Sequence, residues 1–214
     1  KENKRSPSSA RKPGPKEYIP HMEKSRRVSL LITGTVQGVF YRRETQREAQ
    51  KLGLAQATAL FKACRGHEVP LIINDHLELA LEIDADGVHL GGEDGSIAAA
   101  RKKLGPDKIL GASCHNQLQN ALEAQRAGAS YVAFGSFFAS GVKPDAVHAP
   151  LELLREAKEK LSVPVVAIGG ITHANAPQLI AAGADSIAVI SALFDAPDVK
   201  LAAQEFCDLF PQRS

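Results

Sequence analysis

Six short apolar runs follow one another along the C-terminal three-quarters of the chain, at residues 69–73, 87–90, 109–112, 131–134, 163–168 and 186–190. Within each run the apolar residues are nearly continuous and do not alternate with polar ones. That pattern is typical of parallel strands that are buried on both faces. We therefore predict six parallel strands in this part of the chain.

Stretches with helical periodicity separate these runs, at residues 97–104, 116–127, 150–161 and 176–182. Gly128 and Gly183 stand where helix C-caps would fall. Regular alternation of strand and helix predicts a parallel α/β fold, either a doubly wound sheet or a (β/α) barrel of the TIM type. Two features favour the barrel: no antiparallel edge signal interrupts the six units, and Gly169-Gly170 and Ser191-Ala192 follow the last two strands, where barrels often bind phosphate.

The upstream part of the chain adds less than a full barrel needs. Residues 28–32 predict one more strand, and residues 43–65 predict one helix or two. Seven strands result, whereas a closed barrel has eight. We expect an incomplete barrel, whose unpaired strand edge would be either a liability for aggregation or a site for pairing with a second copy in a homodimer.

Composition changes this picture only at the N-terminus. The 214 residues are 44% hydrophobic and 23% charged with a net charge of +2, and no apolar run is long enough to cross a membrane. Residues 1–27 hold nine Lys or Arg against three Glu and are rich in Pro and Ser, which predicts a disordered basic tail. This tail lacks the interleaved aromatics of a nucleic-acid-binding segment. The three cysteines have neither disulfide nor zinc spacing, so we expect a cytoplasmic protein.

Candidate chemistry lies just after the predicted strands, where (β/α) barrels carry their functional groups. Two carboxylates from adjacent strand ends, Asp75 and Asp94, could share one Mg²⁺, although Asp at such a turn also serves as a helix N-cap. Lys143 could bind a phosphate or be a solvated loop lysine, and His115 could be a general acid–base or a polar loop histidine. Cys114 lacks an activating partner, and His67 and His89 are interpreted as structural or solvated.

Several motifs, taken in order, resemble the thiamine phosphate synthase family over about residues 59–210: 71–75 (LIIND), 87–94 (GVHLGGED), 111–113 (GAS), 134–135 (FG), 166–171 (VAIGGI) and 188–191 (AVIS). The resemblance implies a TIM barrel that joins a hydroxymethylpyrimidine diphosphate to a thiazole phosphate and releases pyrophosphate. It also implies site roles: Mg²⁺ on Asp75 and Asp94, pyrophosphate on Asn74, Ser113 and Lys143, and thiazole phosphate on the backbone of Gly170, Ile190 and Ser191. Ser113, Lys143 and Arg42 would be the catalytic residues.

The chain departs from that family's pattern at three positions. Ser140 keeps one hydroxyl of the loop before Lys143, but Val142 replaces the second. Arg42 matches the family's arginine, whereas Phe40 replaces a glutamine and Glu44 replaces a lysine. These changes leave open a catalytically impaired, phosphate-binding barrel.

Residues 27–54 more closely resemble the opening of an acylphosphatase, through residues 32–42 (ITGTVQGVFYR). Such a loop forms an anion nest with an arginine clamp, here Arg42. The tryptophan-containing strand that should follow is absent, since the chain has no Trp. We accordingly expect a basic tail over residues 1–27, an acylphosphatase-like β-loop-α segment over 28–58, and a barrel over 59–214. An acylphosphatase-type hydrolase remains the alternative activity.

Overall fold

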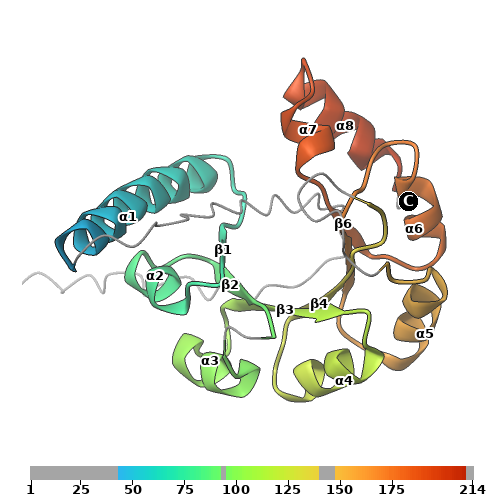
Figure 1. Ribbon diagram of the computed structural model, residues 1–214, viewed down its shortest axis with the longest axis horizontal. Coiled ribbons are helices and arrows are strands. Elements are labelled where there is room, and N and C mark those ends of the chain that lie inside the picture. Colours follow the sequence, from blue (N-terminus) through green and yellow to red (C-terminus); the bar gives the residue numbers. More distant parts are fainter. Residues whose placement is uncertain (1–42, 93–94, 140–147, 211–214) are drawn as a thin grey trace, which may run out of the picture.

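The computed structural model describes residues 43–92, 95–139 and 148–210, and side chains from Gly53 onward. Six strands form one parallel sheet whose spatial order is the order of the sequence, from β1 to β6. The strands are β1 Ile72–Asn74, β2 Gly87–Leu90, β3 Ile109–His115, β4 Tyr131–Phe134, β5 Val165–Ile168 and β6 Ser186–Ala188. The sheet curls into an open half-barrel, with the helices on its convex side (Figure 1). The predicted barrel class is confirmed; the seventh predicted strand, residues 28–32, lies outside the described residues.

The helices follow the strands as in repeated β/α units. They are α1 Arg43–Gly66, α2 Leu77–Glu82, α3 Ile97–Leu104, α4 Leu118–Arg126, α5 Glu152–Lys160, α6 Ala176–Ala181, α7 Ser191–Phe194 and α8 Val199–Asp208. The upstream helical stretch is thus a single helix, α1, and α2 was not predicted. None of the helices within the described ranges is both long and apolar enough to span a bilayer.

The two faces of the sheet differ in character. Side chains on the outer face are almost fully buried, and they pack against the helices in two apolar clusters; they include Val88, Leu90, Leu110, Ala112, Val132, Phe134, Val165, Ala167 and Ile187. Residues that alternate with these point to the concave, inner face. The inner face is smaller and more polar, and its residues along the strands include Asn74, His89, Gly111, Ser113, Tyr131, Ala133 and Ser186.

The N-terminal end of the sheet is stabilised by a recurring contact. The residue just before one strand accepts a hydrogen bond from a backbone N–H at the start of the preceding strand. Leu71 N–H donates to Asp86 (2.8 Å), Leu110 N–H to Ser130 (3.0 Å) and Val165 N–H to Asp185 (2.9 Å). These contacts satisfy buried donors far from the rim where function is expected.

Several predicted strand boundaries were wrong, and three of them have a clear local reason. The run at 69–73 becomes strand only at Ile72, because Val69 N–H bonds to Cys64 O (3.0 Å) and closes the end of α1. The run at 109–112 continues to His115, so Ser113 and Cys114 lie within β3 and not after it. The run at 186–190 ends at Ala188, because Ile190 begins the first turn of α7.

Candidate active site

Asn74 and Asp75 stand at the C-terminal rim of the barrel, as predicted. Asn74 is the last residue of β1, and Asp75 follows it with φ 63°, a left-handed conformation that Asp tolerates better than most residues. The backbone N–H of Asp75 donates to His89 O on β2 (2.8 Å), and Asn74 Nδ2 donates to Asp75 Oδ2 (2.5 Å). The exposed Asp75 carboxylate is therefore anchored by its own backbone and by its neighbour.

Ser113 lies on the inner face of β3 and contacts a buried histidine. Its Oγ is 2.8 Å from His89 Nε2, and His89 Nδ1 is 2.9 Å from the hydroxyl of Tyr131. His89 is only 4% exposed, the one polar or charged residue in the buried set of the described chain. The structural role expected for His89 is thus consistent with its burial. Tyr131 was not singled out from the sequence, because it stands among apolar strand residues.

Gly170 belongs to a turn on which another loop rests. Its φ is 64°, and a Cβ added there would lie 2.5 Å from Ala139 O and 2.6 Å from Phe138 O. Asn175 secures the same turn, since its Nδ2 donates to Gly170 O (3.0 Å) and its Oδ1 accepts from Thr172 N–H (2.7 Å). The glycine thus lets the loop after β4, which leads to residue 140, approach the turn after β5.

Ile190 and Ser191 open the short helix α7. Ile190 is the N-cap, with φ −116° and ψ −80°, and Ser191 is the first helical residue. Both side chains are exposed. The first N–H groups of a helix have no intrahelical partner, so this end presents backbone donors, as the predicted phosphate role requires.

The remaining predicted site residues fall outside the described ranges: Arg42, Asp94, Ser140 and Lys143, together with Phe40 and Val142. Glu44 lies in α1, but its side chain is not described. The pairing of Asp75 with Asp94 consequently remains a prediction. Within the described ranges no group of three His, Cys, Asp or Glu side chains could hold a metal ion.

The structure also clarifies the two residues that follow Ser113. Cys114 is buried on the outer face of β3, and burial raises the pKa of its thiol to about 12. A thiol with a raised pKa stays protonated at neutral pH, as is usual for a buried, structural cysteine. His115 is exposed at the end of β3 with φ 52°.

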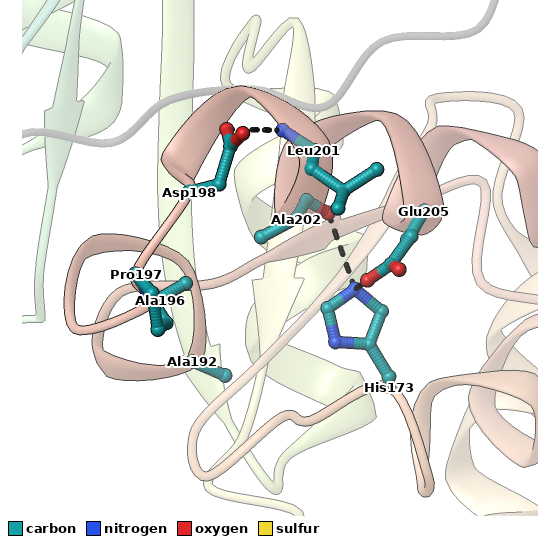
Figure 2. A pocket seen from close by; sticks show the side chains of 8 residues that line it. All are labelled: His173, Ala192, Ala196, Pro197, Asp198, Leu201, Ala202 and Glu205. Atoms are coloured by element: carbon teal, nitrogen blue, oxygen red, sulfur yellow. Dashed lines mark hydrogen bonds and ion pairs between the residues drawn. The ribbon is translucent and has the colours of Figure 1, made fainter.

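A hollow of about 320 Å³ lies between the loop after β5 and helices α7 and α8 (Figure 2). Its polar groups have structural partners: His173 Nε2 contacts Ala202 O (3.1 Å), and Asp198 accepts from Leu201 N–H (2.9 Å). The imidazole also stacks on Phe206, with ring centroids 3.7 Å apart. These contacts pack α8 against the loop after β5.

Comparisons with known proteins agree with this arrangement. A family model described as thiamine monophosphate synthase matches residues 16–193. The thiamine-phosphate synthase of Nitrosomonas eutropha is 51% identical over 180 residues, 84% of each chain. That of Thiobacillus denitrificans is 55% identical over 183 residues, 86% of each chain.

Solved structures give the same result for the fold. Thiamine phosphate pyrophosphorylase from Pyrococcus furiosus superposes with a TM-score of 0.66 at 40% identity, over 73% of this chain and 74% of that one. A 3-hexulose-6-phosphate synthase shares the fold, with a TM-score of 0.59 at 23% identity over 74% of this chain and 81% of that one.

The acylphosphatase resemblance of residues 27–54 gains no support. The Nitrosomonas and Thiobacillus relatives are both synthases, and the family match that begins at residue 16 runs through that segment. The motifs at the strand ends, the curled parallel sheet and these matches have one common explanation. The chain belongs to the thiamine monophosphate synthase family.

Proposed function

We propose that the protein is a transferase of thiamine biosynthesis, which joins hydroxymethylpyrimidine diphosphate to thiazole phosphate and gives thiamine phosphate and pyrophosphate. The observation that carries the proposal is the identity of about half of all positions with curated thiamine-phosphate synthases over 84–86% of the chain. The positions of Asn74, Asp75, Gly170 and Ser191 at or just after strand ends, and of Ser113 on the inner face of β3, suit this chemistry.

In the proposed reaction the bond between the methylene carbon of the pyrimidine substrate and the diphosphate oxygen breaks, pyrophosphate leaves with the bonding electrons, and the thiazole nitrogen forms the new bond to that methylene carbon. Negative charge grows on the leaving group, so fixed donors aimed at it lower the barrier. Asn74 and Ser113 point to the same inner face and would donate hydrogen bonds to that group. The cationic side chains of Lys143 and Arg42 would bind it as well. The turn at Gly170 and the start of α7 would hold the thiazole phosphate through backbone N–H groups.

Asp75 suits the role of a magnesium ligand. Its carboxylate is exposed at the rim, and the pairing of Asn74 with His89 supports a position near the end of β2, after which Asp94 follows in the sequence. Mg²⁺ takes one or two carboxylates and completes its shell with water and phosphate oxygens. Bound there, the ion would neutralise charge on the diphosphate.

A coupled assay with both phosphorylated substrates tests the proposal. We expect thiamine phosphate to form with MgCl₂ present and formation to stop on addition of EDTA.

Asp75→Asn should raise the Mg²⁺ concentration needed for half-maximal rate by about tenfold or more, because one charged ligand becomes neutral. The matched control is Asp84→Asn, since Asp84 is also exposed with a positive φ of 55° but pairs with Lys108 at the opposite end of the barrel. Equal Mg²⁺ requirements in the two variants would reject the Asp75 assignment.

The same preparation separates the alternatives. No thiamine phosphate at high enzyme concentration, with pyrophosphate binding retained in calorimetry, would identify a catalytically impaired phosphate-binding barrel. Hydrolysis of acetyl phosphate that is lost in Arg42→Ala would support the acylphosphatase-type activity, for which the sequence of residues 32–42 is the sole argument.

A further inference from the structure

A histidine and a tyrosine meet at one level of the barrel interior, on either side of a glycine. His89 on β2 pairs in register with Gly111 on β3, and Gly111 pairs in turn with Tyr131 on β4. Gly111 has no side chain, and a Cβ there would overlap Tyr131 Cζ and Oη and His89 Nδ1. The imidazole and the phenol therefore meet over Gly111, with Nδ1 and Oη 2.9 Å apart.

The second ring nitrogen of His89 faces Ser113. Ser113 is two residues beyond Gly111 on β3, so it shares the inner face and lies nearer the rim. Its Oγ is 2.8 Å from Nε2, which makes Tyr131, His89 and Ser113 a continuous hydrogen-bonded row. A histidine that is only 4% exposed loses much hydration, and these partners compensate for that loss.

We propose that Tyr131 and His89 are positioning residues, which fix the Ser113 hydroxyl as a hydrogen-bond donor to an anionic oxygen of the substrate. Tyr131 donates its O–H to His89 Nδ1, and His89 donates Nε2–H to Ser113 Oγ. The hydroxyl proton of Ser113 is then left to point toward the rim. This inference rests on the proposed function, in which Ser113 contacts the diphosphate.

The direction of the row follows from the chemistry of its two ends. Burial raises the pKa of Tyr131, so the phenol keeps its proton and can donate it. A diphosphate oxygen can only accept a hydrogen bond. In the opposite arrangement Ser113 would donate to Nε2 and turn its lone pairs toward that oxygen, which is unfavourable.

A double-mutant cycle tests the coupling. Ser113→Ala should lower kcat roughly 10- to 100-fold, since it removes a bond to a charged acceptor. Tyr131→Phe should lower kcat about 3- to 10-fold in the wild-type background, the effect of one neutral hydrogen bond. If Tyr131 acts through Ser113, its substitution should change kcat less than about twofold once Ser113 is Ala. The same loss in both backgrounds would overturn the proposal.

Matched variants separate positioning from general packing. Ser186→Ala makes the same substitution on the inner face of β6, and Tyr131→Phe should keep its full effect in that background. His89→Gln retains an amide N–H near the position of Nε2, whereas His89→Leu fills the space without a donor. Gln should therefore keep at least about tenfold more kcat than Leu at comparable Tm; equal rates would contradict a donor role.

A spectroscopic measurement needs no turnover. ¹⁵N-histidine NMR of the whole protein, with His89 assigned by its loss in His89→Gln, should find the proton on Nε2 and none on Nδ1. A proton on Nδ1 would overturn the row as drawn. If the wild-type protein makes no thiamine phosphate, the proposed function fails, while this measurement still decides the direction of the row.

Discussion

At the scale of single residues, the turn at Gly170 shows how a backbone requirement and a close contact coincide. The residue has φ 64°, and two carbonyls of the loop after β4 lie where a Cβ would be. Gly105 has a similarly positive φ of 79°, but nothing lies within 4 Å of its would-be Cβ. The pair thus separates conformational strain from steric overlap.

We predict that Gly170→Ala lowers the free energy of unfolding by more than Gly105→Ala. The control should cost about 1–3 kcal/mol from its backbone alone, because φ 79° with ψ 179° is a conformation that residues with a Cβ rarely adopt. Gly170→Ala should cost about 1–3 kcal/mol in addition, because the loop at residues 138–139 must move. Urea denaturation measures both, and equal losses would mean that the loop accommodates the methyl group freely.

Cys114 predicts a pH dependence of stability. Burial raises its pKa from 9.0 to about 12 in the folded protein, so above pH 9 the unfolded chain binds fewer protons than the folded one. Stability is therefore fully present below pH 9 and is lost as the pH rises toward 12, by up to about 1.4 kcal/mol per pH unit for this group.

Urea midpoints between pH 8 and 11 check this expectation, with Cys114→Val as the control. The variant should show a shallower decline, because the remaining loss then comes from other groups such as Tyr131, whose pKa burial also raises. An identical decline of the urea midpoint with pH in both proteins would show that Cys114 does not contribute to the loss of stability.

At the scale of elements, α1 has an apolar face that packs on the core, and one residue with low helix propensity. Leu54, Leu60 and Phe61 pack against the apolar cluster beneath α2 and β1, at helical spacing. Gly53 lies inside the helix, where glycine has the lowest propensity apart from proline, and nothing lies within 4 Å of its would-be Cβ.

Gly53→Ala should accordingly stabilise the protein by about 0.5–1 kcal/mol. Thermal and urea denaturation measure the change. Gly66→Ala, which also meets nothing within 4 Å but stands at the last residue of α1, should gain less. A destabilised Gly53→Ala would mean that α1 ends or bends at that point in solution.

The elements also show what the sequence could and could not foretell. The strands at Gly87–Leu90 and Tyr131–Phe134 and the helix at Ile97–Leu104 have the predicted bounds, because turn residues flank each pattern. The start of β1 was misplaced because an apolar residue such as Val69 can equally close a helix. Rim positions such as Asp75 follow from strand ends alone, but the contact of His89 with Tyr131 depends on register across three strands. A single sequence does not specify that register.

At the scale of the whole molecule, the division of the chain into tail, segment and barrel remains a proposal. Residues 1–27 were predicted to be a basic tail, whereas the family match begins at residue 16. Truncations that start at residues 16, 28 and 43 separate these boundaries. If the tail ends at residue 27, the first two should keep Tm and kcat, and only the third should lose turnover, because it removes Arg42. A lower Tm on starting at residue 28 would place residues 16–27 in the folded unit.

The edges of the sheet make a separate prediction about association. Among the described residues, β1 and β6 are the outer strands of the sheet, each paired with a single neighbouring strand. A strand edge that presents backbone N–H and C=O groups can pair with another chain. If residues 28–32 cover one of these edges, removing them should raise self-association, so the truncation that starts at residue 43 should scatter more light than the one that starts at residue 28. Equal masses for the two truncations, with dimers in both, would locate the homodimer contact elsewhere. Monomers in both would instead show that neither edge recruits a second copy.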